Sequence, residues 1–246
     1  MWTTAISIGK EYEKEFDYMV GKFERSRDLT FATGTSRYRN FIEIAAEDRC
    51  GAAVTKKVIE VIADIVLIYF KASYIKSRLI TAAQKPSDPM AVLISSLVYF
   101  DAGIENRLIN RLIERQSEYA VDGIFLFRMR ELLENWDELC ALSTSLLSSE
   151  PAESDIVNLT SFLIDASDAK KNKIKISDGA SPEIFNLSTG EKAYVHDIFS
   201  DEKQNLIGAV IGCYPEEIFV EKEGRIADTF KKIVKINRSI PNYGTF

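Results

Sequence analysis

Two arginines, Arg128 and Arg130, are the side chains of this sequence best placed to do chemistry. They lie in residues 123–139, where large apolar residues recur at helical spacing and predict one helix with a buried stripe. A planar guanidinium beside such a stripe either closes an internal ion pair or binds an anionic group. Both arginines are therefore candidate ligand-binding residues. For Arg128 we favour the internal ion pair, because buried arginines are usually paired.

Acidic clusters are the second group of residues that could do chemistry. They are Asp101 with Glu105, and Glu131, Glu134, Asp137 and Glu138. Paired carboxylates can serve acid–base or magnesium chemistry, but on an amphipathic helix they more often form the solvated face. Glu131 and Glu134 also stand at the spacings that neutralise Arg128 and Arg130. We therefore expect a solvated face rather than a site.

Catalytic and metal-binding patterns are otherwise missing from the sequence. The single histidine, His196, has no nucleophile assigned to it by spacing, so we expect a structural or exposed histidine. No cluster of His and Cys suggests a metal, and no glycine-rich loop suggests a phosphate group. The sequence therefore predicts no catalytic residue, no metal and no cofactor, and an enzyme is the less favoured class.

Charge and cysteine usage limit the compartment and the partners. The net charge is −6 over 246 residues, which opposes sequence-independent binding of nucleic acid. A local patch of lysines at 170, 171, 173 and 175 keeps nucleic acid as a third, weaker possibility. The three scattered cysteines, Cys50, Cys140 and Cys213, are typical of free thiols in a reducing compartment.

No membrane segment is predicted. The most apolar stretch, residues 58–70, is interrupted by Glu60 and Asp64 and is shorter than the roughly twenty residues of a bilayer span. The N-terminus lacks the pattern of a signal peptide. We therefore expect a cytoplasmic protein.

Periodicity predicts an α+β fold in three segments, with a small N-terminal α/β layer (1–86), a central helical layer (87–169) and a C-terminal α/β segment with short strands (170–246). The last two segments could form one compact unit. In the first, strands at residues 3–8, 29–33 and 39–46 accompany helices at 10–25 and 52–80. Gly34 is expected to take positive φ in a turn between the second and third strands.

The later segments follow from caps and alternation. Two prolines break the chain at residues 84–89, with Asp88 expected to cap the next helix. One helical stripe there comprises Ile104, Leu108, Leu112 and Ile113. Strands are predicted at residues 173–177, 183–187 and 217–221, and helices after a cap at Ser200 or Asp201 and at 226–234.

Residues 123–129 read Gly-Ile-Phe-Leu-Phe-Arg-Met, and this run resembles the Gly-Phe-x-x-Phe-Arg-Leu element of a known family, the YtxC-like sporulation proteins. The apolar helix at 206–211, the Tyr-Pro-Glu-Glu turn with the strand to residue 220, and the helix at 226–235 are similar to the family's closing elements. The resemblance covers about residues 101–235. Phe125 is displaced by one position and Met129 replaces Leu.

The resemblance implies a spore-forming bacterium and a cytosolic protein, but no chemistry. We therefore expect a sporulation-associated protein that acts by binding or assembly, with a protein partner. The competing hypothesis is an enzyme or ligand-binding module that holds an anionic group through Arg128. An exposed apolar patch would favour the first hypothesis, and an open pocket with Arg128 in its wall would favour the second.

Overall fold

Two units, drawn from interleaved stretches of chain, make up the computed structural model. The first contains residues 1–70 and 103–136, and the second contains residues 71–102 and 137–246. The structure describes residues 1–80, 86–113, 117–147, 152–167, 169–177, 182–220 and 225–237. Each unit holds one four-stranded sheet and helices, which confirms the predicted α+β class. The division into segments 1–86, 87–169 and 170–246 stays a prediction.

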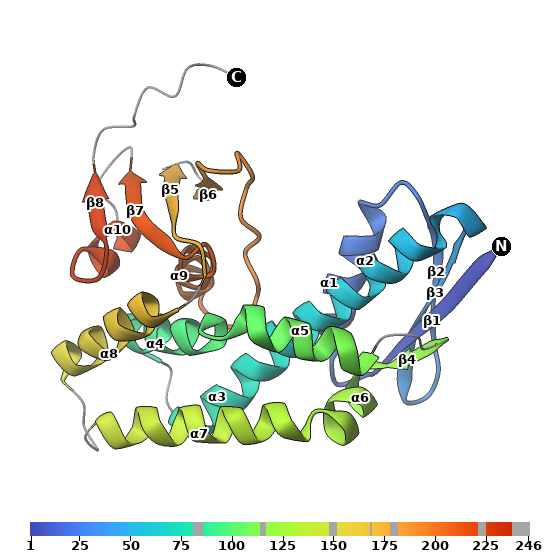
Figure 1. Ribbon diagram of the computed structural model, residues 1–246, viewed down its shortest axis with the longest axis horizontal. Coiled ribbons are helices and arrows are strands. Elements are labelled where there is room, and N and C mark those ends of the chain that lie inside the picture. The colour runs from blue at the N-terminus through green and yellow to red at the C-terminus, as the bar shows by residue number, and fades with distance from the viewer. Residues whose placement is uncertain are drawn as a thin grey trace. The chain divides into compact units, whose positions relative to one another are not determined.

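The first unit is built on a sheet with the strand order β2-β3-β1-β4 (Figure 1). The strands are β1 (Trp2–Gly9), β2 (Thr30–Thr35), β3 (Arg39–Ala46) and β4 (Glu118–Ala120). β1 pairs antiparallel with β3 and parallel with β4. The strands predicted at residues 3–8 and 39–46 are confirmed. β4 was not predicted, since three residues are too few for an alternating pattern to show.

One face of this sheet is buried. Ile6 of β1 and Ile42 of β3 are fully buried on it, and the ring of Phe23 in α1 lies 6.4 Å from that of Phe31 in β2. The unit's helical elements are α1 (Glu13–Glu24), a 3-10 turn (Asp48–Cys50), α2 (Gly51–Asp64), a π-helical turn (Ile65–Phe70), α5 (Ala102–Ile113), α6 (Val121–Arg128) and the start of α7 (Arg130–Leu146). The predicted helix at residues 10–25 is confirmed.

The opposite face carries no fully buried side chain, and we call it the open face. Residues paired across antiparallel strands point to the same side, so the registers define its members. They are Thr3, Ala5 and Ser7 of β1, Thr30, Ala32 and Gly34 of β2, Arg39, Phe41, Glu43 and Ala45 of β3, and Glu118 and Ala120 of β4. Most of these side chains are small, which leaves the backbone of the sheet close to solvent.

The hairpin between β2 and β3 closes two residues later than predicted. Gly34 lies within β2 opposite Phe41 and does not take positive φ, so the predicted turn at Gly34 is wrong. The chain reverses after Ser36, whose N–H donates to the carbonyl of Arg39 at 2.8 Å. The Ser36 hydroxyl also accepts from the N–H of Arg39 at 3.1 Å, which stabilises this turn without a glycine.

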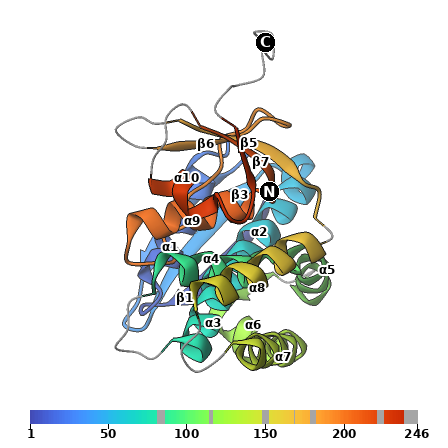
Figure 2. The same cartoon turned by 90° about the vertical axis from the view of Figure 1, so that its left-hand side faces the viewer.

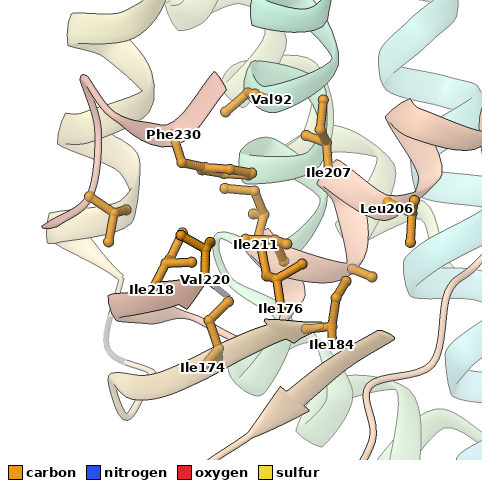
Figure 3. Close-up of a cluster of buried hydrophobic side chains, with 13 residues drawn as sticks. Val92, Ile174, Ile176, Ile184, Leu206, Ile207, Ile211, Ile218, Val220 and Phe230 are labelled. Atoms are coloured by element: carbon orange, nitrogen blue, oxygen red, sulfur yellow. The ribbon is translucent and has the colours of Figure 1, made fainter. Parts of the chain in front are cut away.

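The second unit is built on a sheet with the order β6-β5-β7-β8. Its elements are α3 (Lys71–Leu79), α4 (Asp88–Tyr99), α8 (Glu153–Ala166), β5 (Asn172–Ser177), β6 (Glu183–Asn186), α9 (Glu202–Gly212), β7 (Pro215–Val220), α10 (Arg225–Phe230) and β8 (Lys235–Asn237). Ile174 and Ile176 of β5 meet Ile207 and Ile211 of α9 in one buried cluster (Figure 3). The three predicted strands are confirmed, and β8 is an addition.

Helix α4 packs against both α8 and α9 (Figure 2). Its N-cap is Ser87, whose hydroxyl accepts from the N–H of Met90, rather than the predicted Asp88. The error is one residue, because Asp88 and Pro89 both suit the first turn. For α9 the predicted cap at Asp201 is confirmed, since its carboxylate accepts from the N–H of Gln204 at 3.2 Å.

Candidate functional site

Arg128 is the last residue of α6, and its side chain is exposed. The predicted single helix over residues 123–139 is wrong, because the chain leaves helical geometry at Met129 (φ −108°, ψ 31°) before α7 begins. Met129 is fully buried, as are Leu132 and Trp136 of α7. The bend therefore turns Met129 into the core and leaves Arg128 at the surface.

The structure separates the two predicted ligand-binding arginines. Arg130 pairs with Glu134 one turn along α7, with Nε 2.8 Å from Oε1, and both side chains are exposed. Such surface pairs contribute only about 0.3–0.5 kcal/mol. Arg128 has no carboxylate within ion-pair distance among the residues that the structure describes. The internal ion pair favoured for Arg128 is therefore not found in that part of the chain.

A different arginine makes the internal ion pair, namely Arg39 of β3. Its guanidinium donates twice to the carboxylate of Asp122 in α6, with distances of 3.0 and 2.5 Å, and its Nε donates to the Ser7 hydroxyl at 3.2 Å. Both Arg39 and Asp122 are largely shielded from solvent, so this bidentate pair fixes α6 at the sheet. Sequence reasoning missed it, since 83 residues separate the partners.

A hollow of about 640 Å³ lies where Arg128 meets the open face. Its walls come from β1, β3, β4 and α6, and include Ser7, Phe41, Glu43, Phe127 and Arg128. A second hollow of about 620 Å³ lies over β2, β3 and the start of β1. Three residues line both hollows, namely Ala5, Glu43 and Glu118. They form a row across β1, β3 and β4, and this row separates the two hollows on the open face.

The charges around the hollow are mostly negative. Glu43 and Glu118 both stand opposite Ala5 from the two neighbouring strands, which places their Cβ atoms roughly 10 Å apart. Neither has a cation within ion-pair distance in the described ranges. Since two carboxylates face one guanidinium, an anion bound by Arg128 would also meet their repulsion. The surface is therefore better suited to a partner with basic side chains.

Large apolar side chains border this charged surface. Leu126 is 61% exposed and Phe127 is 84% exposed, although both belong to a helix whose Ile124 is buried. Exposed neighbouring apolar residues beside polar ones are typical of protein-interaction sites. The Ser7 hydroxyl, which also lines the hollow, accepts a hydrogen bond from Arg39. The exposed apolar pair beside the two glutamates is the feature of this surface that favours recognition.

The acidic clusters are not uniformly solvated. Asp137 pairs with Arg78 at 3.0 Å on the surface, as the solvated-face interpretation expects. Glu105, however, is buried and accepts a 2.6 Å hydrogen bond from the indole Nε1 of Trp136. The buried side of α5 carries Glu105, Ile109 and Ile113, whereas Ile104 of the predicted stripe is 52% exposed. For Glu105 and Ile104 the sequence interpretation is wrong.

The remaining polar candidates have structural surroundings. His196 is buried beside the ring of Tyr194, at 4.8 Å between ring centroids. Its loop is fastened by Asn205, whose amide donates to Asp197 and to the carbonyl of Phe199. No group of His, Cys, Asp and Glu in the described residues could hold a metal ion.

The cysteines and two of the lysines noted in the sequence also have defined surroundings. All three cysteines are free thiols, and burial raises the pKa of Cys213 to about 11. In the lysine group, Lys171 donates to the carbonyl of Ile164 and Lys173 pairs with Glu217. Lys171 and Lys173 are therefore engaged within the second unit.

A partly buried polar cluster joins α1 to α2. The Tyr18 hydroxyl donates to the Asp64 carboxylate at 2.5 Å, and the Lys22 Nζ lies 3.8 Å from it. Burial raises the pKa of Asp64, although the Tyr18 hydrogen bond and the Lys22 charge oppose that effect. Burial likewise lowers the pKa of Lys22. Partial burial therefore weakens the preference of both groups for the charged form.

No helix in the described part of the chain is long and apolar enough to cross a membrane. Comparison of the chain with protein-family models, with curated proteins and with solved structures finds no match.

Proposed function

We propose that the protein acts by binding a partner protein through the open face, in the cytoplasm of a spore-forming bacterium. The observation that carries this proposal is the combination of exposed Phe127 with the row of Glu43 and Glu118 on a floor of small side chains. The complementary partner surface is apolar where it meets Phe127 and carries basic side chains toward the two glutamates. The sporulation setting rests on the resemblance of residues 101–235.

Complementation of a deletion strain tests this proposal. Phe127→Asp, and the double change Glu43→Lys with Glu118→Lys, are expected to lower the yield of heat-resistant spores to that of the deletion, while the purified variants stay folded. Matched controls are Phe162→Asp in α8, where the ring is 59% exposed, and Glu191→Lys in an exposed turn. These controls are expected to complement fully.

The possible failures of that experiment are distinct. A deletion strain with normal spore yield would contradict the sporulation setting. A deletion phenotype that both Phe127→Asp and the double Glu→Lys variant complement fully would contradict the assignment of the open face and its α6 border.

A second candidate function is the binding of an anionic ligand by Arg128. It is favoured by one observation, since Arg128 lines a hollow and no described carboxylate pairs with it. Inorganic phosphate and citrate serve as probes, with the melting temperature as the measurement. This candidate predicts stabilisation of the wild type and none of Arg128→Met, whereas partner binding predicts no stabilisation of either. Arg130→Met is the matched control, because Arg130 lies outside the hollow.

A further inference from the structure

The row of Glu43, Ala5 and Glu118 runs across the strands of the open face. Each glutamate stands opposite Ala5, one from β3 and the other from β4. Neighbouring strands lie about 4.8 Å apart, so the Cβ atoms of the two glutamates are roughly 10 Å apart with only a methyl group between them. Both glutamates are exposed. The sheet therefore holds two carboxylates at a defined spacing, on a line perpendicular to its strands.

The row has one of the two hollows on each side. The pair Ser7 and Phe41 lies on the side of the hollow that Phe127 borders, and the pair Thr3 and Ala45 lies on the side of the other hollow. The two hollows measure about 640 and 620 Å³, so they are similar in size. An element that lies along the row therefore has room for a side chain on either side of it.

The spacing of the two glutamates distinguishes the kinds of element that match the row. On one face of a β-strand, side chains recur at about 6.7 Å and again at about 13 Å, and neither value matches roughly 10 Å. On an α-helix, residues i and i+7 are about 10.5 Å apart along the axis. They also point in nearly the same direction, because seven residues make almost two turns. A helix therefore directs two side chains at the two carboxylates, whereas a strand does not.

The same helical geometry places side chains in both hollows. Residues i+3 and i+4 lie about 4.5 and 6 Å along the axis from residue i, which is the level of Ala5 in the row. They point to opposite sides of the row, since the helix turns by about 60° one way and 40° the other way to reach them. One of them therefore enters the hollow beside Phe127, and the other enters the hollow over Thr3 and Ala45. Because the floor consists largely of small residues, it accommodates large apolar side chains there.

We propose that the partner presents an amphipathic helix that lies along the row, with basic residues at i and i+7 and large apolar residues at i+3 and i+4. The basic residues pair with Glu43 and Glu118, because opposite charges across an interface select the partner and fix its register. The apolar residues fill the two hollows, one of them against Phe127. This inference rests on the function proposed above and names the element through which the partner binds.

Synthetic helices test the spacing on the full-length chain. The probe is a peptide of about 18 residues, held helical by lactam bridges on its far face because short isolated helices are marginal in water. It carries lysines at i and i+7 and leucines at i+3 and i+4. The matched control is an isomer with the second lysine at i+5, which turns that lysine to the other side of the helix without changing composition or charge. Amide chemical shifts of the isotope-labelled protein at low ionic strength measure binding.

The first peptide is expected to shift the amide signals of Ala5, Glu43 and Glu118. It should bind roughly fivefold more tightly than its isomer, since the isomer reaches only one of the two carboxylates. In the variant Glu43→Lys with Glu118→Lys the preference should reverse, so that a third peptide with glutamates at i and i+7 binds more tightly than the lysine peptide. Glu191→Lys, at an exposed position, is the matched control and should keep the wild-type preference.

Equal affinity of the two lysine isomers would overturn the proposal, because the attraction would then be a general one between opposite charges. Shifts confined to residues away from the row would overturn it, and so would the absence of binding by the lysine peptide. These results differ from a failure of the proposed function, which the spore-yield experiment decides. Open-face variants that lose spore yield, together with isomers that bind equally, would show a binding surface for an element other than this helix.

Discussion

Asp64 holds its proton more tightly in the folded protein than in the unfolded chain. Its pKa is raised above the ordinary value of 3.8 because burial disfavours the carboxylate, and the Tyr18 hydroxyl and the Lys22 charge only partly compensate. A carboxyl with a raised folded pKa stabilises the fold fully below the unfolded pKa, and that contribution is lost as pH rises through the folded value. The ionised Asp64 is therefore a cost to stability at neutral pH.

Replacing Asp64→Asn should remove this pH-dependent cost. Asparagine keeps an acceptor for Tyr18, so the free energy of unfolding of the variant, relative to wild type, is expected to improve as pH rises from 3.8 toward neutrality. Urea unfolding at a series of pH values measures this difference. Asp17→Asn is the control, because Asp17 is exposed on α1, next to Tyr18 in the sequence. Parallel pH profiles for wild type and Asp64→Asn would contradict the assignment.

At the scale of elements, the bend between α6 and α7 decides which residues reach the surface. Met129 is fully buried at the bend, whereas Leu126 and Phe127 just before it are mostly exposed. A continuous helix would place these side chains by helical spacing alone. Because of the bend, the direction of the Met129 side chain no longer follows from the helical spacing of Leu126 and Phe127. One short segment therefore supplies both a core residue and an apolar surface.

Truncation of these side chains should lower stability at the buried position and leave it nearly unchanged at the two exposed positions. Met129→Ala is expected to lower the free energy of unfolding by about 2–5 kcal/mol, because it empties a buried site. Phe127→Ala and Leu126→Ala should change it by no more than about 0.5 kcal/mol. Urea unfolding at one pH measures all three. A Met129→Ala variant as stable as the two surface variants would show that the bend is not held by packing.

Local signals in the sequence predicted most elements, and distant contacts explain the errors. The cap at Asp201 and the alternation around Ile174 depend only on neighbouring residues, so the sequence alone was enough to predict them. The burial of Glu105 depends on an indole 31 residues away, and Arg39 depends on Asp122, 83 residues away. Of the candidate site, only Arg128 was predicted, because Glu43 and Glu118 come together through strand pairing alone.

At the scale of the whole molecule, the chain passes between its two units after residues 70, 102 and 136. The first unit therefore needs both an N-terminal and a central stretch of chain. A fragment of residues 1–86 would lack β4 and α6, and with them Glu118, Phe127 and Arg128. The open face and its border thus exist only in a chain that extends through both stretches.

The pairing of β4 with β1 has a consequence for synthesis on the ribosome. The Thr4 hydroxyl donates to the carbonyl of Ser117, and 113 residues separate the two. At about 5–20 residues per second, β1 waits on the order of ten seconds for its parallel neighbour. During that interval the nascent chain presents one unpaired edge of β1 to chaperones and to other nascent chains. A translational pause before residue 118 would lengthen this exposure.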